Sequence, residues 1–273
     1  VKQEDCMRVN VEDVIKAVKN AAKILTRDLG ANESDMDIEI KASNRDVVTK
    51  YDLEVQNSLI AELGSMYPDV LVIGEEDTKD SGQVGESKFA REFFLIDPVD
   101  GTTNFVHDFR HSSISVAYGK DGKILLGVVM NPYTNEIFHA VKGKGAYLNN
   151  KRIHVSGHGI KDSLVLFGTS PSTNDTHDRT FKILKHVFLN TKDIRRTGSA
   201  ALDLGYIAAG RADFFFELIL HPWDYAAGII LIQEAGGVIF DFDGNDLPLD
   251  RPSSVVAGNP LSYKDGIKLL KEV

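Results

Sequence analysis

The sequence predicts a mixed α/β fold in which helices and sheets pack in layers. The chain has 273 residues, 42% of them hydrophobic and 26% charged, which is typical of globular proteins and long enough to bury a large core. Segments with helical spacing alternate with short apolar segments typical of strands. Two of those apolar segments end in acidic residues. Helices and strands mixed in this order favour layers built around shared cores.

The first part of the chain is expected to hold two helices followed by a series of strands. Residues 11–29 place apolar side chains at helical spacing, and Gly30 ends this helix. Two short strands are expected within 37–49, and a second helix within 52–66, before Pro68. The next expected segments are a strand at 70–77, a polar loop at 78–92, a strand at 92–100, and strands alternating with hairpin turns from 113 to 155.

The composition loosens around residues 156–162, where we expect a boundary between two subdomains, 1–157 and 158–273. The first would carry the acidic motifs and the second would be another α/β unit. The elements expected after the boundary are a strand at 163–169, a helix at 175–190, a strand at 193–197, a helix at 199–210, a strand at 212–216, a helix at 222–236, a hairpin at 237–247 and a helix at 261–272.

Composition and charge exclude several classes of function. The single cysteine, Cys6, rules out a disulfide within the chain and suits a reducing compartment. No apolar run reaches the length of a membrane span, and the charged N-terminus has no signal core, so we expect a cytoplasmic protein. The net charge of −9, from 31 basic and 40 acidic residues, argues against a nucleic-acid surface. An anionic substrate remains compatible, because bound metal ions reverse the sign of a local site.

Three acidic motifs are the candidate functional residues. Glu75-Glu76-Asp77 and Asp97-Pro98-Val99-Asp100 each follow an apolar strand, and they converge if the two strands are neighbours. Asp224 follows Pro222, which suits the first turn of a helix. Four carboxylates without a lysine or arginine in their motifs require cations, and oxygen ligands favour Mg²⁺. Two such ions that share a carboxylate stand about 3.5–4 Å apart in phosphoryl-transfer sites.

The residues after Asp100 favour a phosphate beside these metals. Gly101 lets the backbone approach a ligand closely, and a short helix that begins here would direct its N–H groups at the phosphate. The hydroxyl of Thr102 is able to orient a water molecule. Each motif also has a structural interpretation: Asp-Pro-x-Asp-Gly is a turn sequence, Glu75-Glu76-Asp77 suits a solvated loop, and Asp224 suits a helix cap. Spacing alone leaves both interpretations open.

The motifs together resemble those of the inositol monophosphatase family of Mg²⁺-dependent, lithium-sensitive phosphomonoesterases. The residues that carry the resemblance are Gly74-Glu75-Glu76, Asp97-Pro98-Val99-Asp100-Gly101-Thr102-Thr103-Asn104, Trp223-Asp224 with Ala226-Ala227-Gly228, and Glu234-Ala235-Gly236-Gly237. Their order and spacing match the family from about residue 12 onwards. The resemblance implies a layered αβαβα sandwich of the sugar-phosphatase type, and usually a homodimer.

The resemblance also implies a set of metal ligands. Glu75, Asp97 and the backbone carbonyl of Val99 would bind the first Mg²⁺ ion. Asp97, Asp100 and Asp224 would bind the second. Glu75 also borders a third and weaker position, so two or three ions are implied.

Catalytic and substrate-binding roles follow from the same resemblance. Thr102 and Glu75 would position and deprotonate the attacking water, and Asp52 would support Thr102. The N–H groups of Gly101 and Thr102 would hold the phosphate, and Lys41 would lie in a mobile loop near the weak metal. The residues implied on the substrate side are Gly198, Ser199, Ala200 and Glu217, together with Asp100 and Asp224.

The implied reaction is hydrolysis of a phosphate monoester of a small polyol or sugar, with myo-inositol 1-phosphate as the first expected substrate. Glu217 favours a neutral polyol. Arg195 and Arg196 keep a bisphosphate open, and Arg110 is either a phosphate contact or a surface charge. The alternatives are fructose 1,6-bisphosphate and other sugar, nucleotide or histidinol phosphates. A regulatory binding protein with secondary phosphatase activity is the alternative from another class.

Overall fold

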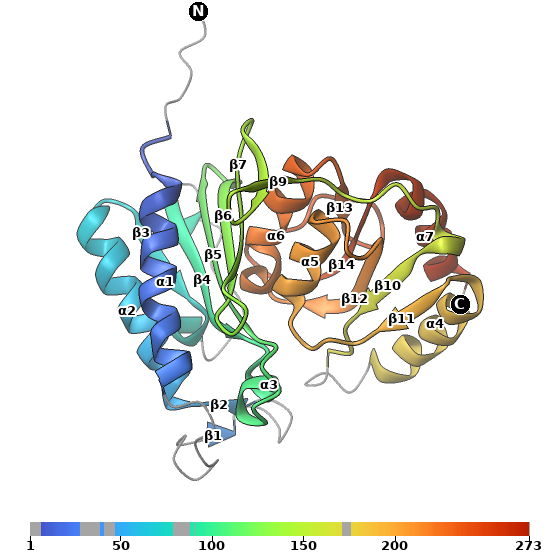
Figure 1. Cartoon of the computed structure of the whole chain (residues 1–273), viewed down its shortest axis with the longest axis horizontal. Coiled ribbons are helices and arrows are strands. Elements are labelled where there is room, and N and C mark those ends of the chain that lie inside the picture. The colour runs from blue at the N-terminus through green and yellow to red at the C-terminus, as the bar shows by residue number, and fades with distance from the viewer. Residues whose placement is uncertain are drawn as a thin grey trace, which may run out of the picture.

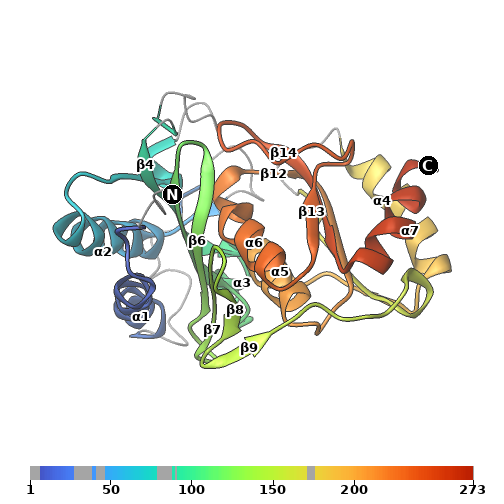
Figure 2. The same cartoon turned by 90° about the horizontal axis from the view of Figure 1, so that it is seen from above.

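The computed structural model describes residues 7–27, 39–40, 47–78, 88–89, 91–170 and 176–272. Helices α1 and α2 cover one face of a seven-stranded sheet, and α5 and α6 lie between this sheet and a five-stranded one (Figures 1 and 2). Helices α4 and α7 cover the outer face of the second sheet. The predicted mixed α/β class and its order of layers are confirmed.

The first sheet is antiparallel except at its edge, where β3 runs parallel to β4. Its strand order is β3-β4-β5-β6-β7-β8-β9, with a separate two-stranded sheet β1-β2. The elements of this part are α1 (Val11–Arg27), β1 (Glu39–Ile40), β2 (Val47–Val48), α2 (Lys50–Met66), β3 (Leu71–Gly74), β4 (Glu92–Asp100), α3 (Thr102–Val106), β5 (Ser113–Lys120), β6 (Lys123–Asn131), β7 (Glu136–Val141), β8 (Gly145–Leu148) and β9 (Lys151–Ile153).

The second sheet has the strand order β11-β10-β12-β14-β13 and mixes parallel and antiparallel pairs. The elements of this part are β10 (Leu164–Phe167), α4 (His177–Asn190), β11 (Asp193–Arg195), α5 (Ala200–Ala208), β12 (Phe214–Leu220), α6 (Pro222–Glu234), β13 (Val238–Phe240), β14 (Ser253–Gly258) and α7 (Pro260–Lys271). Within the described ranges, no helix is both long and apolar enough to cross a membrane.

Three expected elements differ from the structure. The hairpin at 237–247 is wrong: β13 pairs with β14, a strand that the sequence did not predict, and the carboxylate of Asp241 folds the turn between them by accepting the N–H of Asn245. The strand at 212–216 extends to Leu220, because the apolar run continues on both sides of Glu217. The strand at 70–77 ends at Gly74, and Glu75–Thr78 form a 3-10 helix.

The core between the two sheets takes side chains from both halves of the chain. Phe93 and Val129 from the first sheet pack in one cluster with Leu204 of α5 and Trp223 of α6. A Cβ atom on Gly228 would lie 2.3 Å from Leu204 Cδ1, so only glycine allows α5 and α6 to approach this closely. The subdomain boundary expected at 157/158 falls in the irregular segment after β9 and stays a prediction.

Candidate active site

The first two acidic motifs lie side by side at one end of the seven-stranded sheet. Gly74, the last residue of β3, pairs with Ile96 of β4, so Glu75 follows one strand where Asp97 lies on the next. Asp97 is only 2% exposed, and its Oδ1 accepts the N–H of Val99 at 3.1 Å. This hydrogen bond within the segment 97–100 stabilises the turn that ends β4. Strand β4 and the segment after β3 together supply three of the four predicted acids, Glu75, Asp97 and Asp100.

Asp100 connects the two halves of the chain. Its carboxylate accepts hydrogen bonds from the hydroxyls of Ser113 and Ser199 and from the backbone N–H groups of Ala200, at 3.2 Å, and Ala201, at 2.8 Å. The last two N–H groups belong to the first turn of α5, where the helix dipole favours a negative charge. The structure therefore places the predicted residues Ser199 and Ala200 directly against Asp100.

The fourth acid, Asp224, lies in the first turn of α6. Pro222 begins this helix, as the sequence predicted, and the Oδ2 of Asp224 accepts the N–H of His221 at 2.7 Å. The rings of His221 and Trp223 stack with their centroids 4.7 Å apart, which fixes the entry into the helix. Asp224 thus reaches the other three acids from the opposite half of the chain.

The electrostatics of this cluster favour a cation. Burial raises the pKa of Asp97 well above its usual range, and the charges of Glu75, Asp100, Asp224 and Asp52 raise it further. The pKa of Asp224 is also raised well above its usual range, first by desolvation and then by Asp100 and Glu75. These carboxylates repel one another, and every charge that acts most strongly on Asp97 is another carboxylate.

The donor set fits Mg²⁺, although the side chains are not already arranged around an ion. Among the described residues, no three His, Cys, Asp or Glu side chains have the arrangement of a metal site. Carboxylates rotate about their side-chain bonds when a cation enters, so these donors are able to close around an ion. Four carboxylates and a backbone carbonyl form the oxygen-only set that Mg²⁺ prefers.

Gly101 turns the chain from β4 into α3 and brings it against the second half. Its φ of 89° lies in the left-handed region, and a Cβ atom there would lie 2.8 Å from the carbonyl oxygen of Gly198. Asn104 also joins these segments, because its Nδ2 donates to the carbonyl oxygens of His111, at 2.7 Å, and Thr197, at 2.9 Å. The predicted phosphate-binding and substrate-side residues are therefore in contact.

Thr102 and Asp52 also lie together, as the resemblance implied. The hydroxyl of Thr102 lies 3.0 Å from the carbonyl oxygen of Val99 and 3.3 Å from Asp52 Oδ1. The other oxygen of Asp52 accepts from the N–H and the hydroxyl of Thr49 at the start of α2. Burial, opposed by these hydrogen bonds and reinforced by the charge of Glu75, raises the pKa of Asp52 to about 7.

A cavity of about 210 Å³ lies between the two halves of the chain. Asp97 and Asp52 are buried behind its wall. The described residues that line it are Glu75, Asp100, Gly101, Thr102, Thr103, Asn104, Phe167, Gly168, Arg196, Gly198, Ser199, Ala200, Asp203, Glu217, Leu220 and Asp224. Lys41, the remaining predicted site residue, lies outside the described residues.

Glu217 lines the side of the cavity that the second sheet supplies. Its Oε1 accepts the N–H of Ser170 at 2.8 Å and the Ser170 hydroxyl at 3.3 Å. Burial raises the pKa of Glu217 to about 7 against these hydrogen bonds, and Asp100 raises it further while Arg196 lowers it. The sequence analysis missed Ser170, which comes near Glu217 only through the pairing of β10 with β12.

Asp203 is a second residue that sequence reasoning missed. It is 2% exposed, lines the cavity from α5, and accepts a hydrogen bond of 2.7 Å from the hydroxyl of Thr197. Burial raises its pKa well above the usual range. The available signal was its sequence context, because Asp203 is the only charged residue in the otherwise apolar helix Ala200–Ala208.

Comparisons with known proteins identify the family to which the chain belongs. A profile of the inositol monophosphatase family matches residues 8–273. The chain is 38% identical to the Nus factor SuhB of Vibrio cholerae over 95% of this chain and 90% of that one. It is 36% identical to the fructose-1,6-bisphosphatase/inositol-1-monophosphatase of Thermotoga maritima, over 86% of this chain and 87% of the relative.

A solved structure shares the whole fold. The crystal structure of the extragenic suppressor protein suhB from Bartonella henselae superimposes with a TM-score of 0.85 at 32% identity, and covers 96% of this chain and 98% of that one. The similarity therefore extends over both sheets and all of the helical layers between and around them.

Proposed function

Because the chain belongs to the inositol monophosphatase family, we propose that it hydrolyses the phosphate monoester of a small polyol, with myo-inositol 1-phosphate as the first expected substrate. The chain is a phosphomonoesterase, and members of this family generally use Mg²⁺. The observation that carries the proposal is the cluster of Glu75, Asp97, Asp100 and Asp224. These carboxylates repel one another, and three of them, Glu75, Asp100 and Asp224, line a single cavity.

We assign two metal positions to these residues, and a third and weaker one beside Glu75. Glu75, Asp97 and the carbonyl of Val99 would hold the first ion, and Asp97, Asp100 and Asp224 the second. When bound, Mg²⁺ lowers the pKa of a coordinated water and offsets charge on the phosphate. Because Asp97 serves both positions and is the most enclosed of the acids, its loss would affect the whole site.

The residues around the metals orient the water and the phosphate. The single proton of the Thr102 hydroxyl has two acceptors within reach, the Val99 carbonyl at 3.0 Å and Asp52 Oδ1 at 3.3 Å. With that carbonyl on a metal ion, Thr102 would donate to Asp52, which leaves the lone pairs of this hydroxyl free to accept a hydrogen bond from the attacking water. Glu75 would take the proton that the water loses. The N–H groups of Gly101 and Thr102 would hold the phosphate oxygens, because Gly101 brings the backbone close to the cavity.

The opposite wall would bind the alcohol part of the substrate. Gly198, Ser199 and Ala200 line the cavity beside the acids, and Glu217 lines it from β12. The hydrogen bonds from Ser170 hold the carboxylate of Glu217 in place. Glu217 would accept hydrogen bonds from hydroxyl groups of the polyol, so its contribution is to binding rather than to the chemical step.

Phosphate release from a panel of compounds tests the proposal. The panel contains myo-inositol 1-phosphate, glycerol 2-phosphate, fructose 1,6-bisphosphate, histidinol phosphate and a nucleotide bisphosphate, each with Mg²⁺, with EDTA and with added Li⁺. We expect release that requires Mg²⁺, falls with Li⁺ and is fastest with myo-inositol 1-phosphate. Release that persists unchanged in EDTA would exclude the metal assignment, and no release from any compound would exclude the hydrolase.

A regulatory binding role is the second candidate function, favoured by the name Nus factor that the V. cholerae relative carries. Capture of binding partners by wild-type protein and by Asp97→Asn, with and without substrate, separates the two. Partners that bind both proteins equally would establish a role independent of hydrolysis. We also propose a cytoplasmic location, in line with the single cysteine of the chain, and a homodimer, as the family resemblance implies; cell fractionation and light scattering test these two proposals.

A further inference from the structure

Strand β5 places a serine opposite each of the two acids of β4. In the antiparallel register of the two strands, Asp97 lies opposite Ser115 and Asp100 lies opposite Ser113. The two acids are three positions apart and the two serines only two, so β4 carries a bulge of one residue between the pairs. Residues that lie opposite each other in a ladder share a face of the sheet, and so do residues two apart on β5. The bulge therefore brings both acids and both serines to one face.

This face packs against the second half of the chain. Leu95 and Ala117, an opposite pair two positions before, lie in the same core cluster as Trp223 of α6. Asp97 is 2% exposed and Ser115 is 1% exposed. Helix α6 packs on both β4 and β5, and its first turn carries the fourth acid of the cluster. The hydroxyl of Ser115 is thus enclosed in the layer that holds the proposed metal ligands.

The two pairs of an acid and a serine differ in their hydrogen bonds. The Ser113 hydroxyl donates to Asp100 Oδ2 at 3.2 Å. The enclosed Ser115 hydroxyl forms no hydrogen bond with any described residue. Within the same part of the chain, the Asp97 carboxylate accepts one hydrogen bond, from the N–H of Val99. A buried hydroxyl without a partner costs free energy, so the stability of the metal-free fold does not explain Ser115.

We propose that Ser115 is a positioning residue for Asp97: its hydroxyl donates to the Asp97 carboxylate when this carboxylate turns to hold Mg²⁺. The inference rests on the metal positions of the proposed function. The Cβ atoms of opposite residues lie about 4.5–5.5 Å apart, so the carboxylate is within reach of the hydroxyl. An ionised carboxylate has about four acceptor positions. Two metal ions and the N–H of Val99 would take three, and the fourth remains for Ser115.

A hydrogen bond of this kind fixes the orientation of a metal-binding side chain and thereby strengthens metal binding. Ser115 would do for Asp97 what Ser113 already does for Asp100. The structural alternative is that position 115 only needs a small residue where α6 packs on β5. Alanine is equally small and lacks the hydroxyl, so Ser115→Ala separates the two explanations.

The test compares Ser115→Ala with the matched control Thr180→Val. Both changes remove a hydroxyl that belongs to a 1% exposed residue and has no partner among the described residues. Thr180 lies on α4, which covers the outer face of the second sheet (Figure 1). Titration calorimetry measures Mg²⁺ binding to each protein. For Ser115→Ala we expect the dissociation constant for Mg²⁺ to rise about 10-fold, while Thr180→Val should bind Mg²⁺ as the wild type does.

Thermal unfolding gives a readout that does not depend on turnover. In EDTA, both variants should unfold at the wild-type temperature or slightly above it, because each has lost a hydroxyl without a partner. At one fixed Mg²⁺ concentration, the rise in unfolding temperature should be smaller for Ser115→Ala than for the other two proteins. Phosphate release by Ser115→Ala should also need about 10-fold more Mg²⁺ to reach half of its maximal rate.

Three outcomes overturn the proposal. Unchanged Mg²⁺ affinity in Ser115→Ala would leave Ser115 as a small residue that fits against α6. An equal loss of affinity in Thr180→Val would show that the effect is not specific to Asp97. A clearly lower unfolding temperature of Ser115→Ala in EDTA would show that the hydroxyl already has a partner in the metal-free protein. If instead the wild-type protein binds no Mg²⁺, the metal assignment of the proposed function fails, and the role of Ser115 fails with it.

Discussion

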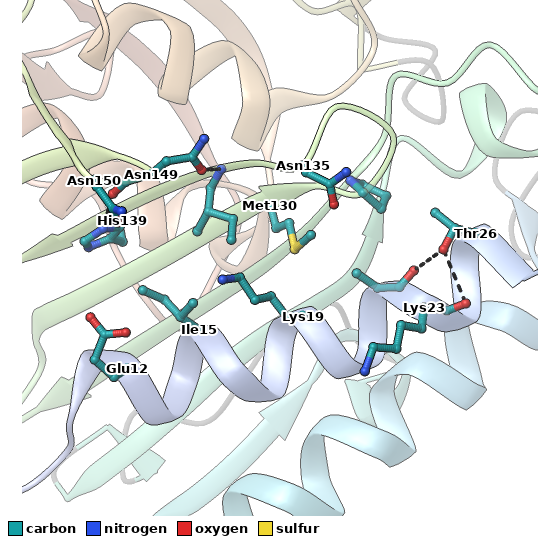
Figure 3. Close-up of a pocket in the computed structure, with 13 residues that line it drawn as sticks. Glu12, Ile15, Lys19, Lys23, Thr26, Met130, Asn135, His139, Asn149 and Asn150 are labelled. Atoms are coloured by element: carbon teal, nitrogen blue, oxygen red, sulfur yellow. Dashed lines mark hydrogen bonds between the residues drawn. The ribbon is translucent and has the colours of Figure 1, made fainter.

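Two of the cavities in the described part of this molecule differ sharply in size and in chemistry. The larger, about 520 Å³, lies between α1 and the part of the first sheet formed by β6, β7 and the turns after β6 and β8. Figure 3 shows Ile15, Lys19 and Met130 along it. The smaller, about 210 Å³, lies between the halves of the chain. Volume alone favours the first. The proposed chemistry belongs to the second, because among the described residues its carboxylates are the ones that are buried and raise the pKa values of one another.

Several polar groups around the larger cavity form hydrogen bonds with their own neighbours. Lys23 Nζ donates to Asn20 Oδ1 at 3.0 Å. The Thr26 hydroxyl donates to the carbonyl of Ala22, and Asn149 Oδ1 accepts the N–H of Ile137 (Figure 3). All of its lining residues lie between positions 12 and 150, where α1 packs on the first sheet. It is formed by the first half of the chain alone, whereas the smaller cavity requires residues from both halves.

The largest expected effect comes from removing a shared acid of the smaller cavity. Asp97→Asn should lower phosphate release about 10³-fold or more, because both proposed metal positions lose a ligand. The fold should survive, and without metal the variant should unfold at the same temperature or a higher one, since one repelling charge is gone. Phosphate release and thermal unfolding measure the two effects. Turnover near that of the wild type with Mg²⁺ would refute the assignment.

The stability of the metal-free protein should depend on pH through the same acids. The pKa values of Asp52 and Glu217 are both raised to about 7, and those of Asp97 and Asp224 are raised well above their usual range. The folded state thus binds more protons than the unfolded state. Their favourable contribution is complete below about pH 4 and is lost as the pH rises through about 7.

In EDTA, the unfolding temperature should therefore be about 5 °C lower at pH 8 than at pH 5.5, and Mg²⁺ should recover most of the difference at pH 8. Calorimetric scans at both pH values, with EDTA and with Mg²⁺, provide the measurement. Glu217→Gln serves as an internal control, because it removes one titrating group and should flatten the slope. An unfolding temperature in EDTA that rises from pH 5.5 to pH 8 would contradict the raised pKa values.

A smaller effect is expected from the alcohol side of the cavity. A Cβ atom on Gly168 would lie 1.8 Å from Glu217 Oε2, so Gly168→Ala must displace this carboxylate. We expect KM for myo-inositol 1-phosphate to rise about 5- to 10-fold while kcat changes less, because binding is lost rather than chemistry. Gly159→Ala is the matched control, since nothing lies within 4 Å of its Cβ position. Equal kinetics in the two variants would remove Glu217 from substrate binding.

The smallest effect is expected at the larger cavity. Lys19 is exposed on α1 and points along this cavity (Figure 3). Lys19→Gln should leave kcat and KM for every compound of the panel within about twofold of wild type. The same kinetic assays provide the measurement. A selective change in KM would show that the larger cavity influences substrate binding in the smaller one. The separation of the two cavities into one with and one without a role in the reaction would then be wrong.

The sequence predicted the parts of this molecule that depend on neighbouring residues. The acids of Asp97–Asn104 lie in one short segment, and the apolar strands before them identify the edge of the sheet. Strand β14 was missed because its pairing with β13 spans a turn stabilised by Asp241, whose motif resembles a tight hairpin. Pairing of distant strands is set by tertiary packing rather than by local pattern.

The cavity-lining residues show the same limit. Asp203 and Ser170 carry no motif of their own, and their contacts arise only when α5 and β10 have packed. The three arginines are equivalent in the sequence, since each lies near a motif. Their surroundings differ in the fold, where Asp193 and Asp108 neutralise two of them. The sequence therefore predicted the acids proposed to bind metal ions more fully than the residues that surround the substrate and determine which substrate is bound.

The hydrogen bonds between Asp100 and the start of α5 also set an order for events on the ribosome. A nascent chain displays Glu75, Asp97 and Asp100 about a hundred residues before Ala200 and Ala201, whose N–H groups fix Asp100, have been translated. Asp224 emerges later still. The four acids therefore reach their final arrangement only when synthesis is nearly finished. A polypeptide that ends before Ala200 carries three of the four acids without the N–H groups that orient Asp100.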